Sequence, residues 1–427
     1  MTAHGGQPVR PTPPYAPRLR VLALPSFWLM VCLVGYGAYR IGGIVRRGLD
    51  LYPTATAAAL VLFAVYAVPF VLFVRARDFL EPEPIPLLVA AFAWGGLAAT
   101  AQALPANAAI RGLAAKLVSP AFAEQWSAAL AGPTVEEPLK ALGVVVIALL
   151  ARWQINSVVD GFVYGAFVGL GFQIVEDVVY SINNVHLAGR GDVLGPVVST
   201  FLLRGFVGGL WSHTMFSALA GAGIGYALVR VARPVARRVG VAALALAGAW
   251  LCHFVWNSPL LMDGFGAGGW GVVAALVLKG APALAVILWL ARVARRQEAE
   301  YYVRWLTSLD DPVAVTPGEL RALARPGGRR AARAYARERS GTAAARIVDR
   351  LQRVQARLAV ELSRDGYYPP WRDEAHVLRT ELVRLRHPDA AAPADSAAAI
   401  WRWAGWLALA ALVVFGLTYA INALGAY

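Results

Sequence analysis

The chain has 427 residues, of which 58% are hydrophobic and only 15% are charged. A soluble enzyme or binding domain does not carry this much apolar sequence in long uninterrupted runs, so the composition excludes both classes. The formal net charge of +14 comes almost wholly from arginine. In a chain this apolar, a basic excess indicates cytoplasmic loops and anionic lipid as partners, with no nucleic acid.

Long apolar stretches dominate the chain, and a run of about 20 apolar residues predicts a membrane-spanning helix. The stretches lie at about 21–39, 54–74, 84–104, 130–151, 157–181, 203–229, 240–261, 270–292 and 400–424. The sequence therefore predicts an all-α fold, a polytopic transmembrane helical bundle with about nine spans, embedded in the lipid bilayer.

Composition divides the chain into four parts. Residues 1–20 are polar and rich in proline, which predicts a disordered tail, and residues 21–295 form the transmembrane part. Residues 296–398 interleave arginine with acidic residues and include Thr316-Pro317-Gly318-Glu319, which has the form of a helix-capping box. We expect a small charged helical segment there, and residues 399–427 as a last transmembrane helix. A solvated or lipid-surface role is the simpler interpretation of the charged segment; partner docking or regulation is the alternative.

The distribution of arginines predicts the orientation in the membrane. Positively charged loops stay on the cytoplasmic side, and the N-terminal arginines and the cluster Arg230–Arg238 agree with a cytoplasmic N-terminus. Residues 296–398 then also lie in the cytoplasm. The loop Arg40–Arg47 disagrees, because it would lie outside. We expect a multi-pass protein of the cell membrane with its N-terminus inside.

Ionisable and amide side chains interrupt four of the predicted spans. They are Glu136, Glu137 and Lys140 in the fourth span, Glu176 in the fifth, His213 in the sixth, and His253 and Asn257 in the seventh. A charged group at the centre of a bilayer costs roughly 2.5–3.5 kcal/mol, so such groups indicate function. Counting 1.5 Å per residue from the span ends places them roughly 8–15 Å below the outer surface. A common depth predicts one buried site.

Small residues recur beside these groups. Gly161, Gly165 and Gly169 are spaced by four residues, and Gly205 and Gly209 lead toward His213 with the same spacing. Glycines at this spacing allow transmembrane helices to approach closely. We expect tight packing around the polar residues.

Glutamate and histidine together suit peptide hydrolysis, which needs an activated water, a proton acceptor and a stabilised oxyanion. In one route His213, His253 and Glu176 hold zinc with a position left for water. In the other, a glutamate activates water without metal and the histidines stabilise the oxyanion. The residues alone leave both routes open, and neither HExxH nor GxSxG occurs in the chain.

Two functions other than proteolysis use intramembrane polar residues. A secondary transporter or proton-coupled membrane protein also places Glu, His and Asn near the middle of the membrane. Transporters commonly repeat their motifs in two halves, and no second copy of the Glu136-Glu137-x-x-Lys140 pattern occurs. A scaffold without chemistry would not explain polar groups at one depth.

Four motifs in order resemble those of the PrsW intramembrane protease family, a relative of the CAAX prenyl endopeptidases and bacteriocin-processing membrane proteases. They are Glu136-Glu137-x-x-Lys140, Phe172-x-x-x-Glu176, an isolated His213, and His253-x-x-x-Asn257. The resemblance covers roughly residues 80–295 and implies an intramembrane endopeptidase that acts on a membrane-anchored protein substrate.

The resemblance also implies roles for individual residues. Glu136 and Glu137 match the paired glutamates, of which at least one acts as the general base. His213 and His253 match the histidines that bind metal or stabilise the oxyanion, and Glu176 and Asn257 match the second acidic motif and the amide. Asp177 departs from the family pattern, in which we expect asparagine.

Overall fold

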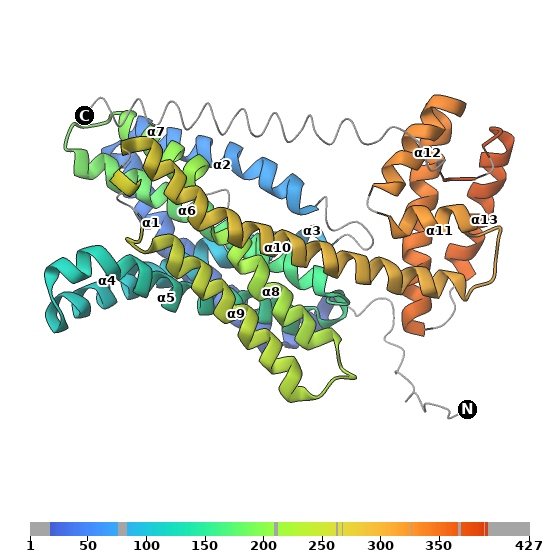
Figure 1. The fold of residues 1–427 in the computed structure, drawn as a ribbon, viewed down its shortest axis with the longest axis horizontal. Helices are drawn as coiled ribbons and strands as arrows, with labels where there is room; N and C mark the ends of the chain where they lie inside the picture. Colours follow the sequence, from blue (N-terminus) through green and yellow to red (C-terminus); the bar gives the residue numbers. More distant parts are fainter. Residues whose placement is uncertain are drawn as a thin grey trace. The chain divides into compact units, whose positions relative to one another are not determined.

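A computed structural model describes residues 18–75, 83–208, 212–261, 264–266, 268–325, 327–365, 369–387 and 389–391. These residues form helices and connecting turns, with no strand among them (Figure 1). They divide into two compact units, one made of the helices from Val21 to Arg292 and the other of the helices from Val293 onward. The predicted ninth span at 400–424 and the predicted tail up to residue 17 lie outside the described residues.

In the first unit, the described residues form ten α-helices. They are α1 (Pro25–Leu51), α2 (Pro53–Arg75), α3 (Ile85–Ala93), α4 (Thr100–Leu117), α5 (Pro120–Leu150), α6 (Val158–Ala188), α7 (Gly195–Thr200), α8 (His213–Val229), α9 (Val235–Asn257) and the first part of α10 (Gly268–Thr307). The π-helical segment Trp94–Ala99 joins α3 to α4 without a break, and a second one, Phe201–Gly208, continues α7.

Six of the described helices are long and apolar enough to cross a membrane. They are Pro25–Leu51, Pro53–Arg75, Ile85–Leu117, Val158–Ala188, Val235–Asn257 and Ala274–Thr307. Helix α8 is apolar but shorter, and α5 carries the charged side chains of the predicted site. The polytopic all-helical fold is confirmed.

The stretch 203–229, predicted as one span, is not a single helix. The π-helical segment is described as far as Gly208, and α8 begins at His213 after Ser212, whose backbone angles of φ −101° and ψ −130° are not helical. Two consecutive glycines, Gly208 and Gly209, stand near this point, and glycine is a poor helix former. His213 is therefore the first residue of its helix.

Helix α6 lies at the centre of the first unit and packs against α8 through its glycines. A Cβ atom built at Gly161, Gly165 or Gly169 would lie only 2.2–2.3 Å from a backbone oxygen of α8. Those oxygens belong to Gly221, Ser217 and His213 respectively, so the contact fixes the register of His213 against α6. Gly205 does not share this face, because its nearest neighbour is the Tyr66 ring, and Gly209 lies outside the described residues.

The second unit consists of the end of α10 with α11 (Pro317–Ala324), α12 (Gly328–Asp365) and α13 (Pro369–Arg384). Its core is formed by residues such as Leu306, Leu351 and Leu358. The predicted capping box is confirmed, because Thr316 and Glu319 cap each other at the start of α11. The Glu319 carboxylate also accepts two hydrogen bonds of 2.6 Å from Arg379, which ties α11 to α13.

Candidate active site

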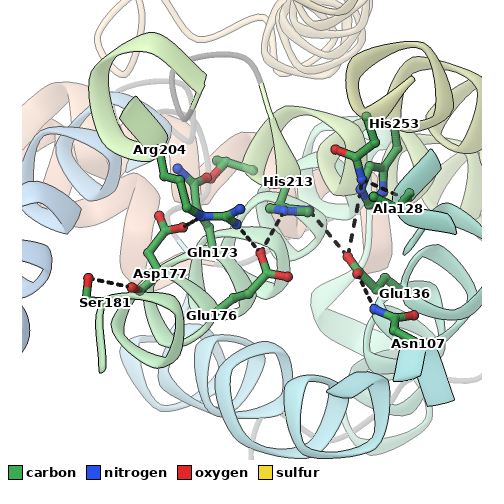
Figure 2. A network of polar contacts seen from close by, with 12 residues as sticks. Asn107, Ala128, Glu136, Gln173, Glu176, Asp177, Ser181, Arg204, His213 and His253 are labelled. Carbon is green, nitrogen blue, oxygen red and sulfur yellow. Dashed lines mark hydrogen bonds and ion pairs between the residues drawn. The ribbon is translucent and has the colours of Figure 1, made fainter. Parts of the chain in front are cut away.

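The predicted polar residues lie close together in the first unit. Figure 2 shows Glu136, Glu176, His213 and His253 beside one another. They come from α5, α6, α8 and α9, which the chain folds against one another. Six of the seven are buried: Glu136, Glu137, Lys140, Glu176, His213 and His253. Asn257 lies at the C-terminal end of α9 and is partly exposed. One compact polar network therefore contains every residue that the motifs selected.

Glu137 is fully buried, and two donors reach its Oε1, while its Oε2 has no hydrogen-bond partner among the described residues. Lys140 Nζ, one turn along α5, lies 2.6 Å from Glu137 Oε1, and His253 Nδ1 lies 2.8 Å from the same oxygen. A carboxylate without solvent contact is stable only when charged or hydrogen-bonding partners surround it. Glu137 therefore has the surroundings of a carboxylate that orients its neighbours.

Glu136 has a different environment. Asn107 on α4 donates a hydrogen bond of 2.9 Å to Glu136 Oε1. The other oxygen, Oε2, is buried and has no hydrogen-bond partner among the described residues. It lies 3.7 Å from His213 Nδ1 and 3.9 Å from His253 Nε2. Glu136 thus presents one oxygen to the space between the two histidines.

Each histidine faces a carboxylate with one ring nitrogen and Glu136 with the other. His213 Nε2 lies 3.2 Å from Glu176 Oε2, and His253 Nδ1 faces Glu137. In a neutral imidazole the nitrogen beside a carboxylate carries the proton, and the other nitrogen offers a lone pair. The lone pairs of both rings would then point toward Glu136 Oε2.

Two donors reach these lone pairs. Lys140 Nζ lies 3.1 Å from His213 Nδ1, and Asn257 Nδ2 lies 3.0 Å from His253 Nε2. Asn257 Nδ2 also lies within 3.1 Å of the Ala128 carbonyl oxygen on α5. The amide therefore links the end of α9 to α5 beside the site.

Arg204 is a site residue that the motifs did not select. Its guanidinium lies 2.5 Å from Glu176 Oε2 and 2.5 Å from Asp177 Oδ1, and it stacks 4.0 Å over the Tyr180 ring. This contact gives Asp177 a charged partner. An arginine within an apolar stretch was the signal in the sequence, because a cation there needs a partner.

Gly132 and Asn107 are two further residues that the motifs missed. A Cβ at Gly132 would lie 3.1 Å from Asn257 Nδ2 and 3.4 Å from His253 Nε2, so glycine keeps space open beside the histidine. Asn107 fixes Glu136 and was visible in the sequence only as one of two amides, with Gln102, in the same helix.

A divalent metal fits the residues present. Ligand atoms of Glu136, His213 and His253 all lie within 4.8 Å of one another. Glu136 Oε2 accepts no hydrogen bond from the residues that the structure describes, and Lys140 Nζ lies 3.9 Å from it. Carboxylates behind both imidazoles are the usual outer partners of metal-binding histidines. Glu176, predicted as the third ligand, is not in this group and contacts Arg204 and His213 instead.

Comparison with known protein families gives one match. Residues 83–293 match the family described as PrsW family intramembrane metalloprotease. No curated protein and no solved structure matches the chain. The matched residues include every member of the polar network and end where the second unit begins.

Proposed function

Because residues 83–293 belong to the PrsW family of intramembrane metalloproteases, this chain is a membrane-embedded protease, and we propose that Glu136 activates the water molecule that attacks the peptide bond of the substrate. The substrate in this proposal is a membrane-anchored protein. One observation carries the assignment: Glu136 Oε2 lies 3.7 Å from His213 Nδ1 and 3.9 Å from His253 Nε2, between the two histidines. In the described part of the chain Oε2 of Glu136 and Oε2 of Glu137 both lack a hydrogen-bond partner, so this position separates the two glutamates. The transporter alternative gains no support from the family match.

Glu136 acts as the general base in the route that uses no metal, because a carboxylate oxygen bound to a metal ion is not free to take the proton. The water oxygen forms a bond to the peptide carbonyl carbon while Glu136 Oε2 takes the proton. The carbon–nitrogen bond then breaks, and Glu136 returns the proton to the leaving amine. Asn107 holds Oε1 throughout, which keeps Oε2 aimed at the reacting water.

The histidines have two candidate roles that share one geometry. Glu136, His213 and His253 would hold a metal ion, for which zinc is our candidate because the ligands are imidazole and carboxylate. A bound zinc ion would supply a Lewis acid that activates water and polarises the peptide carbonyl. Without metal, each imidazole would need a proton on the nitrogen that faces Glu136 in order to donate a hydrogen bond to the developing oxyanion.

The remaining residues position this centre. Glu137 and Glu176 fix the two imidazole rings, Lys140 neutralises Glu137, and Asn257 holds His253 against α5. Outer partners of this kind typically change activity by about 10–100-fold when they are removed. We therefore propose Glu137 as a supporting carboxylate.

Proteolysis is tested by mapping new protein termini in membranes of cells that express the chain. The wild type should generate cleavage sites within membrane-anchored proteins, and Glu136→Gln should remove them. Glu124→Gln is the matched control, because Glu124 lies on the same helix and is exposed. Identical terminus profiles for the wild type and Glu136→Gln would refute the proposed base.

Metal content separates the two roles of the histidines. We would measure zinc in the detergent-purified wild type and in the double variant His213→Ala, His253→Ala. About one zinc per chain that disappears in the double variant would support the metal role. Absence of metal from both proteins would support the oxyanion role, and zinc retained by the double variant would refute the ligand assignment.

A further inference from the structure

The second unit carries a groove lined largely by arginine, which the protease site does not involve. The groove lies along α12 and has a volume of about 820 Å³. It is lined by Arg330, Arg333, Ala334, Arg337, Thr342, Ala345, Arg346, Asp349, Arg350 and Arg353. Pockets that bind small molecules typically have volumes of about 300–1,000 Å³. We call this surface the arginine groove.

A bend in α12 creates the groove. Gly341 has φ 84° and ψ 179°, a conformation that is essentially restricted to glycine, and it separates two helical halves. Arg330, Arg333 and Arg337 repeat at helical spacing on the first half. The arginines of the second half follow the same rule and line the same groove. The bend therefore gathers one arginine-bearing face from each half.

Only part of this positive charge is neutralised within the unit. Asp349 pairs with Arg353 and, at 3.2 Å, with Arg333. Arg350 pairs with Glu374 on α13 at 2.8 Å. The other three arginines are exposed and have no acidic partner among the residues described: Arg330, Arg337 and Arg346.

The pKa of the neighbouring Arg329 reflects the positive electrostatic potential of the groove. Its burial, followed by the charge of Arg333, lowers the pKa of Arg329 to about 10, with Arg353 adding to the effect and Asp349 opposing it. Like charges placed this close destabilise a helix surface, so a merely solvated face would intersperse more acidic residues. The groove has the charge distribution of an anion site.

We propose that the arginine groove binds a small anion that carries two or more phosphate groups. The planar guanidinium forms paired hydrogen bonds with phosphate oxygens, and three guanidinium groups without acidic partners exceed what one phosphate neutralises. Among the residues that the structure describes, no aromatic side chain lines the groove, so recognition depends on phosphate rather than on stacking with a base. A soluble polyphosphate and the two-phosphate headgroup of cardiolipin present the same chemistry.

The test compares two variants of equal charge in the full-length protein. The groove variant is Arg330→Gln, Arg337→Gln, Arg346→Gln, which removes no ion pair seen in the described residues. The control variant replaces three exposed arginines of the same unit that lie outside the groove with glutamine: Arg321, Arg325 and Arg384. If the triple groove variant fails to fold, Arg337→Gln alone replaces it, with Arg384→Gln as its control.

Two probes distinguish the sources of phosphate. Titration calorimetry measures pyrophosphate binding to protein in phosphatidylcholine nanodiscs, and native mass spectrometry measures cardiolipin bound to protein in detergent. We expect the groove variant to bind one of the two probes at least about tenfold more weakly than the wild type does. The affinity of the control variant for the same probe should fall less than about twofold. Loss of pyrophosphate binding identifies a soluble anion, and loss of cardiolipin identifies a headgroup.

Three outcomes would overturn the proposal. The first is that neither probe binds the wild type. The second is an equal loss in the groove and control variants, which would indicate net charge alone. The third concerns competition for bound pyrophosphate. If a polyglutamate peptide displaces pyrophosphate more strongly than either cardiolipin or free polyphosphate displaces it, the groove binds an acidic protein partner instead.

Discussion

Arg204 shows how a residue outside every motif can determine the geometry of the site. It is the only described cation in contact with Glu176 and Asp177, and Glu176 in turn faces His213. Its side chain is 33% exposed, so water partly screens the ion pairs. Its effect should therefore reach the chemistry mainly through the orientation of Glu176 and His213.

We expect Arg204→Gln to lower cleavage by about 10–100-fold, as removal of an outer partner does. It should also lower thermal stability, because two buried carboxylates lose their charged partner. Adding Asp177→Asn should recover part of the stability but not the activity. Cleavage rates and thermal unfolding of Arg204→Gln, of its combination with Asp177→Asn and of the control test this. Full activity of Arg204→Gln would contradict the positioning role, and the exposed Arg190→Gln serves as control.

Asp311 in the second unit makes stability depend on pH. Burial raises the pKa of Asp311, but hydrogen bonds from Arg372, from the Ala314 N–H and from His376 outweigh it and hold the pKa at about 2. Because the pKa is lowered on folding, the stabilisation is complete above the unfolded value of about 3.9 and is lost as pH falls through about 2.

Asp311→Asn should therefore cost about 1–2 kcal/mol at pH 7, after allowance for solvent screening. The difference between wild type and variant should shrink as pH falls from about 4 to about 2. Thermal unfolding of the full chain, followed by helical circular dichroism over this pH range, measures both effects. A difference that does not change with pH would show that Asp311 acts through packing rather than charge.

At the scale of helices, the sequence predicts more of the fold than of the contacts between elements. Apolar runs locate the helices, and the ionisable residues within them identify the site, because both signals are local. The start of α8 at His213 and the contacts of Asn107 and Arg204 could not be predicted in this way. They depend on which helix faces come together, and a single sequence does not contain that information.

The contact between α6 and α8 gives a prediction at this scale. Gly165→Ala would place a methyl group 2.2 Å from the Ser217 backbone oxygen, where nothing flexible can move aside. We expect a loss of about 1–3 kcal/mol or more, together with lower activity, because α8 carries His213. Gly35→Ala is the control, since Gly35 lies within helix α1 and has nothing within 4 Å. Thermal unfolding of both variants tests this prediction. Equal stability of Gly165→Ala and Gly35→Ala would contradict the close contact between α6 and α8.

For the whole molecule, orientation in the membrane remains a prediction from arginine placement. With the N-terminus inside, the turn after α6 lies outside and the turn between α8 and α9 lies inside. Single cysteines at Gly191 and Arg233, in a chain without Cys32 and Cys252, test this. A thiol reagent that does not cross membranes should label position 191 in intact cells, and position 233 only after permeabilisation. The reverse pattern would invert the proposed topology and place residues 296–398 outside.

The polar network also has a net charge when it is taken as one object. Four carboxylates, Glu136, Glu137, Glu176 and Asp177, meet two cationic side chains, Lys140 and Arg204. An interior shielded from water does not sustain two uncompensated negative charges, so two protons or one divalent cation must complete electroneutrality. Loading with metal should therefore release protons. Neutralising an outer carboxylate, as in Glu137→Gln, should weaken metal retention even though that carboxylate is not in the ligand group.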